Sequence, residues 1–169
     1  MQSRNSILTK SCIFVFLAGH CVAEEASPPP SITADVTEAS AAKFTDWIED
    51  YLSSQKVGDP VSTIEVVTFA RDLIESLYRA EVTRFAFRIN ENHYYLLDRK
   101  SIFQFDGGWI LNCTISGHDN YSEARIFVKD DGSIGGDLFI QGTGTFIIKP
   151  TNELPYHIVY LRTGSFSID

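Results

Sequence analysis

The stretch that decides the fold covers residues 109–140 and reads WILNCTISGHDNYSEARIFVKDDGSIGGDLFI. Within it, apolar side chains alternate with others in three short runs, at 109–115, 124–128 and 134–140. A period of two is typical of β-strands that bury one face, because successive side chains in a strand point to opposite sides. The intervening segments 117–120 and 130–132 contain Gly, Asp and Asn, which tolerate the backbone angles of tight turns. The stretch therefore predicts three consecutive antiparallel strands.

The same pattern continues on both sides of this stretch. Further strands are expected at 61–69, at 82–89 and 93–97 around a turn at 90–92, at 145–149 after the turn 141–144, and at 155–162. Residues 72–79 fit either a short helix or an irregular bridge. Seven to eight short strands with turns at this spacing favour a mainly β fold, an antiparallel β-sandwich or open barrel, over any βαβ arrangement.

One amphipathic helix is predicted at 35–57, before the strands. Its apolar side chains follow helical spacing, Asp35 with Glu38 resembles a capping box, and the Gly-Asp-Pro sequence at 58–60 ends it. Several strands also carry aromatic side chains on a second face, namely Phe127, Phe139 and Phe146. The helix could cover these rings, or they could form an exposed patch for a partner protein.

The N-terminus has the organisation of a signal peptide. Basic residues at 4 and 10 precede an apolar run at 12–18, and the small residues Cys21 and Ala23 occupy the minus-three and minus-one positions of the expected cleavage after Ala23. The apolar run is shorter than the ~20 residues that span a bilayer. We therefore expect a signal peptide at 1–23, an extended Pro-rich leader at 24–34, the helix at 35–57 and a β domain at 61–169, in a secreted or periplasmic protein without a stable membrane anchor after processing.

Charge and cysteine content restrict the partners and the source of stability. The net charge is −8, and removal of the leader with its two basic residues, Arg4 and Lys10, brings it to −10. Such acidity disfavours nucleic acid and anionic membranes as partners. Cys113 is the one cysteine after the leader, so the processed chain cannot form an internal disulfide. A cysteine in a strand pattern is most often a buried apolar residue.

The sequence shows no recognisable catalytic, cofactor or metal motif. His93, His118 and His157 are scattered, and no His-Glu-x-x-His helix is present. His118 and Asp119 could bind a metal with Asp130 or Asp131 only if their loops met in space. Ser133 lies in a hairpin rather than a nucleophile elbow, and the Gly pairs lack the lysine of a phosphate loop. We therefore expect no enzyme activity, no cofactor and no metal.

Four segments nevertheless show a family resemblance: Trp109 to Gly117, Tyr121 to Val128, Asp131 to Gly136 and Phe146 to Pro150. They resemble the propeptide region of secreted reprolysin-like zinc metalloproteases and of bacterial peptidyl-Asp metalloendopeptidases. The likeness spans about residues 62 to 169. The matching structural motif residues are Trp109, Cys113, Gly117, Asp131, Gly132, Gly136 and Pro150.

The chain departs from that family pattern in two ways. Residues 129–131 do not supply the cysteine that pairs with the equivalent of Cys113 in animal members, and the sequence ends at Asp169 without a latency cysteine or a zinc-binding helix. The resemblance implies a non-catalytic, propeptide-like domain that binds or restrains a secreted zinc metalloprotease, or a truncated precursor of one. The alternative is a secreted adhesion or ligand-binding β-sandwich module.

Overall fold

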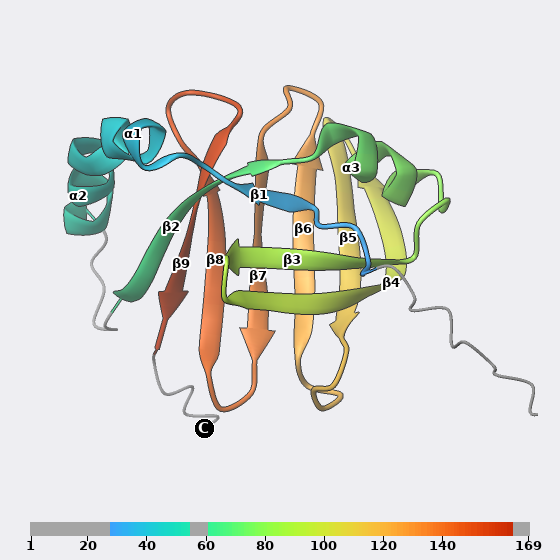
Figure 1. Ribbon diagram of the computed structural model, residues 1–169. Coiled ribbons are helices and arrows are strands. Elements are labelled where there is room, and N and C mark those ends of the chain that lie inside the picture. Colours follow the sequence, from blue (N-terminus) through green and yellow to red (C-terminus); the bar gives the residue numbers. More distant parts are fainter. Residues whose placement is uncertain (1–27, 55–60, 164–169) are drawn as a thin grey trace, which may run out of the picture.

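A computed structural model describes residues 28–54 and 61–163 of the chain (Figure 1). The predicted signal peptide, its cleavage at Ala23, the first part of the Pro-rich leader and the end of the predicted helix lie outside these residues. Within the described residues, no helix combines the length and apolar character needed to cross a membrane.

The described residues form one antiparallel sheet of nine strands, in the order β1-β2-β9-β8-β7-β6-β5-β4-β3. This confirms the mainly β, antiparallel prediction. The strand count exceeds the expected seven to eight, chiefly because residues 33–35 of the predicted leader and helix form a strand. The strands are β1 (Thr33–Asp35), β2 (Val61–Phe69), β3 (Arg84–Asn90), β4 (His93–Phe105), β5 (Gly108–Ile115), β6 (Glu123–Lys129), β7 (Ile134–Ile140), β8 (Gly144–Pro150) and β9 (Tyr156–Arg162).

The two edges of this sheet meet, so it is nearly closed into a barrel. In Figure 1, β3 and β4 cross in front of β5 to β8, and β1 lies beside β3. The Ile32 amide donates to the Ala86 carbonyl at 2.8 Å, and the Ala86 amide donates to the Pro30 carbonyl at 2.8 Å. The buried Thr33 hydroxyl donates to the Arg88 carbonyl at 2.5 Å and accepts from the Arg88 amide at 2.8 Å. These bonds satisfy backbone groups that an open edge would expose.

The barrel is filled by its own side chains. Alternate side chains along β3, the first half of β4 and β5 to β8 are buried in a single apolar cluster, including Phe87, Leu97, Leu111, Ile126 and Leu138. Phe146 belongs to this interior and lies 5.6 Å from the Tyr95 ring. Phe127 and Phe139 lie on the opposite face and are partly buried. The period-two alternation therefore assigns the barrel interior correctly, but Phe146 is a core residue rather than a second-face aromatic.

The predicted N-terminal helix begins later than residue 35 and is interrupted. Helix α1 (Glu38–Ala41), the 3-10 turn η1 (Ala42–Phe44) and helix α2 (Thr45–Ser54) follow one another. Asp35 lies in β1 opposite Val67 of β2, so this residue is part of the sheet and does not begin the helix. The Thr37 carbonyl instead accepts from the amides of Ser40 and Ala41 in the first turn.

The helical segment packs on the outer side of β9. The Phe44 ring lies 5.2 Å from the Tyr156 ring, and the hydroxyls of Tyr51 and Tyr160 are 3.3 Å apart. Burial and the Tyr160 hydrogen bond raise the pKa of Tyr51 well above its usual range. The helix therefore covers the aromatics of β9, and among its described side chains Tyr51 reaches the hollow that Phe127 also lines.

Candidate functional site

Helix α3 (Arg71–Tyr78) forms one wall of the candidate site. It connects β2 to β3 and lies over the end of the barrel where β5 begins and β6 ends (Figure 1). Ile74 and Leu77 are three residues apart and buried, whereas Arg71, Glu75 and Tyr78 are exposed. The helical spacing thus directs one apolar face into the barrel end and leaves polar groups around it. This resolves the ambiguous segment 72–79 as a helix.

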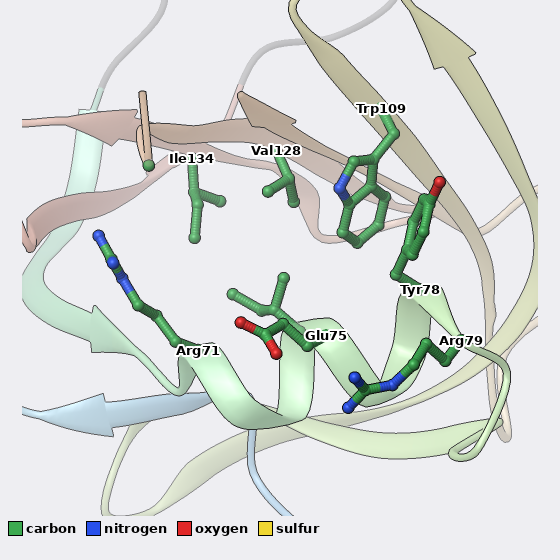
Figure 2. Close-up of a pocket in the computed structure, with 9 residues that line it drawn as sticks. Arg71, Glu75, Tyr78, Arg79, Trp109, Val128 and Ile134 are labelled. Carbon is green, nitrogen blue, oxygen red and sulfur yellow. The ribbon is translucent and has the colours of Figure 1, made fainter. Parts of the chain in front are cut away.

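A cavity of about 430 Å³ lies between α3 and the strand ends (Figure 2). Apolar side chains of Ile74, Trp109, Val128 and Ile134 line it. The charged side chains in the lining all come from α3 and the residue that follows it. The remaining lining residues are Arg71, Glu75, Tyr78, Arg79 and Gly132. An apolar interior with a few polar groups at its border is the usual composition of a small-molecule site.

Two aromatic rings form one end of the cavity. The Trp109 and Tyr78 ring centroids are 5.3 Å apart at an interplanar angle of 48°. The Tyr78 hydroxyl is hydrogen-bonded to the Gln104 side-chain amide of β4. This bond fixes the Tyr78 ring beside Trp109, although 40% of the Tyr78 surface is exposed. The pair offers a flat apolar surface to a ligand.

Arg71 lies at the other end, against the β6–β7 hairpin. The Asp131 carboxylate accepts a hydrogen bond from the Ser133 amide at 2.8 Å. Hydrogen bonding to the Ser133 side chain and then to this amide lowers the pKa of Asp131. The turn places Gly132, at a φ of 84°, beside Arg71. A side chain at position 132 would start 2.8 Å from the Arg71 Nη2 atom. Glycine therefore provides the space that the guanidinium occupies.

His157 supports the Ile134 wall of the cavity from inside the barrel. Its Nδ1 donates to the Pro155 carbonyl at 2.8 Å, and its Nε2 accepts from the Ile134 amide at 3.1 Å. This pattern requires the neutral ring, because a protonated ring has two donors and no acceptor. Burial lowers the pKa of His157 to about 4. The histidine is therefore a structural residue at the start of β7.

The motif residues chosen from the sequence separate in space. Trp109 and Gly132 line the cavity, and Asp131 holds the turn next to it. Gly117 is in the turn after β5 and Pro150 ends β8. Cys113 is buried in the core, and burial raises the pKa of its thiol to about 12. Gly136 lies where a side chain would overlap the Arg125 carbonyl of β6.

The α3 side chains were not recognised as site residues from the sequence. Arg71, Glu75 and Tyr78 belong to the segment that fitted either a helix or a bridge, and they lie more than 30 residues from Trp109 or Gly132 along the chain. The one available signal was the apolar spacing of Ile74 and Leu77, which identifies a helix but not a cavity.

The four side chains of the suggested metal site do not lie close together. His118 and Asp119 precede β6, whereas Asp130 and Asp131 follow it, so a seven-residue strand separates the two pairs. The strand spans about 20 Å. The Asp119 carboxylate also accepts from the Ser122 amide and hydroxyl, each at 3.0 Å. No group of three or more His, Cys, Asp or Glu side chains that could hold a metal occurs among residues 28–54 and 61–163.

Comparison of the chain with protein-family models, curated proteins and solved structures gives no match. Its function must therefore be inferred from its own side chains.

Proposed function

We propose that this domain binds a small, largely apolar molecule in the cavity between α3 and the barrel end. The observation that carries the proposal is the cavity of about 430 Å³ with its apolar lining. Its size falls within the range of about 300–1,000 Å³ typical of ligand pockets, and barrel mouths are a frequent location for them. This agrees with the ligand-binding alternative drawn from the sequence, at a site the sequence did not indicate.

Binding without reaction is the proposed activity. The nine lining residues include no Ser, Cys or His that could act as a nucleophile or a base near neutral pH. The Tyr78 hydroxyl is engaged with Gln104. Trp109 and Tyr78 would contact the ligand with their rings, and Val128 with Ile134 would form the opposite wall.

Tryptophan fluorescence provides the test. A Trp47→Phe background leaves Trp109 as the single tryptophan, since the chain has two, and phenylalanine preserves the ring that stacks on Tyr51. Titration with neutral apolar probes such as 1-octanol and 2-naphthol should change Trp109 emission saturably. Val128→Phe, which fills the cavity, should weaken binding about ten-fold or more, given ~0.8 kcal/mol per buried CH₂.

A matched control is Ile110→Phe, on the neighbouring strand. Ile110 pairs with Phe127 on the outer face and does not line the cavity. The control should bind the probes as the background protein does. The proposal is wrong if no neutral probe gives saturable binding, or if Val128→Phe and Ile110→Phe bind equally well.

A second candidate is the propeptide-like binding of a secreted zinc metalloprotease, which the sequence resemblance implies. Its support in the fold is an exposed aromatic surface on β4: Phe103 and Phe105 are 63% and 37% exposed, and Phe103 pairs with Ile110. Contiguous exposed apolar surface is typical of protein interfaces. Because residues 30–33 bond to the edge of β3, such binding would use this outer face rather than that edge.

An inhibition assay tests this candidate. The purified domain should slow reprolysin-like proteases, and Phe103→Ser should abolish the effect. Tyr94→Ser is the matched control, because Tyr94 is 58% exposed near the beginning of the same strand. Unchanged protease rates across several such enzymes would exclude this function.

A further inference from the structure

The unpartnered guanidinium in the cavity indicates which class of ligand fits. The Arg71 side chain forms no ion pair or hydrogen bond with the described part of the chain. Three other arginines do form ion pairs: Arg79 with Glu81 at 3.0 Å, Arg84 with Asp98 at 2.7 Å and Arg125 with Asp137 at 3.1 Å. Arg71 is thus a cation in a cavity wall with its donors free.

Glu75 does not neutralise it. The two residues are four apart on α3, a spacing that allows an ion pair, yet none joins them. Figure 2 shows the Arg71 side chain extending away from the helix, toward the side of the cavity that Ile134 forms. Its guanidinium lies beside Gly132, where any side chain would start 2.8 Å from Nη2. The guanidinium is therefore directed at the cavity and the hairpin rather than along the helix.

A guanidinium placed at an apolar wall favours a carboxylate. Its planar array of N–H groups matches the two oxygens of a carboxylate, and it carries its charge at every physiological pH. The protein has a net charge of −8 and does not attract anions at a distance. Recognition of an anion must therefore come from this local pairing.

We propose that the ligand is an amphipathic carboxylate, bound with its carboxylate on Arg71 and its apolar body extending past Ile74 and Val128 to Trp109. This inference rests on the proposed cavity-binding function and specifies the ligand and its orientation. Glu75 supports the orientation, because it lies on α3 between Arg71 and Tyr78 and its carboxylate repels an anion placed between the two ends of the cavity (Figure 2). The carboxylate group of the ligand then lies at the Arg71 end of the cavity, away from Glu75.

The test compares octanoate with 1-octanol, which share a chain length and differ in charge. In the Trp47→Phe background, octanoate should bind about ten-fold or more tightly than 1-octanol, because hydrogen bonds to charged groups are worth about 1.5–3 kcal/mol. Arg71→Gln should remove this preference and leave 1-octanol binding unchanged. Arg88→Gln, at an exposed position of β3 outside the cavity, is the control for net charge and should retain the preference.

The outcomes separate the two proposals. Equal affinities for octanoate and 1-octanol would overturn the carboxylate inference and leave cavity binding standing, and this measurement needs no variant at Arg71. Loss of octanoate preference in Arg88→Gln as well would also overturn it, since bulk charge would then explain the effect. Absence of binding by either probe would refute both proposals.

Discussion

His157 makes the stability of the barrel depend on pH in a predictable window. The side chain is 1% exposed and bonds as a neutral ring to Pro155 and Ile134. Burial lowers its pKa from 6.5 to about 4 in the folded protein. At pH values between 4 and 6.5, His157 is therefore protonated in the unfolded chain and neutral in the folded protein. The stabilisation is fully present above pH 6.5 and is lost as the pH falls toward 4.

The magnitude follows from the gap between the two pKa values. At 1.36 kcal/mol for each factor of ten in proton affinity, the full loss is about 3 kcal/mol below pH 4. About 2 kcal/mol of this should be lost by pH 5. Natural domains are stable by about 5–15 kcal/mol, so the loss is a substantial fraction of the total.

The assay is urea unfolding at several pH values between 7.5 and 4, for the natural sequence and for His157→Gln. Glutamine retains one donor and one acceptor but does not titrate. Carboxylates whose pKa values are lowered, such as Asp98 and Asp131, are common to both proteins. The difference between the two plots of unfolding free energy against pH therefore isolates the histidine. As the pH falls, the natural protein should lose about 3 kcal/mol of unfolding free energy relative to His157→Gln. Parallel curves over this range would refute the reasoning, whatever the absolute stability of the variant.

Two substitutions and one labelling experiment test the closure and packing of the barrel. Thr33→Val preserves shape but leaves the backbone groups of Arg88 without their partner, so urea unfolding should show a loss of about 1–3 kcal/mol. Gly136→Ala should be more disruptive, because its Cβ would overlap the Arg125 carbonyl, and a melting temperature equal to that of the natural protein would contradict this. The Cys113 thiol, buried and with its pKa raised to about 12, should react with a thiol reagent only on unfolding; rapid labelling at Cys113 in the folded protein would disprove it.

Local sequence patterns were enough to predict most strands. The alternation at 109–115 and 134–140 depends on neighbours two residues apart, and the turns depend on Gly and Asp at single positions. The sequence did not indicate β1, because a three-residue strand after prolines carries no periodicity of its own. Thr33 and Asp35 become a strand through hydrogen bonding to β2. The predicted β4 was also too short. Its second half is exposed, so its polar and apolar side chains do not alternate clearly.

The cavity could not be predicted from the same information. Arg71 and Tyr78 meet Trp109 and Gly132 only because α3 is seated on the barrel end. An eight-residue helix is marginal in isolation, so its existence depends on burial of Ile74 and Leu77. The resemblance to metalloprotease propeptides remains a prediction about function, and it did not point to this helix.

The sequence by itself determined that the chain builds an antiparallel sheet, because strand alternation and turn chemistry act over a few neighbouring residues. Only the tertiary structure decided that the sheet curls until residues 30–33 bond to β3, that Phe146 faces inward, and that an arginine and an aromatic pair share one cavity. These features join residues distant along the chain, and the free energy of such contacts depends on the packing of the whole barrel.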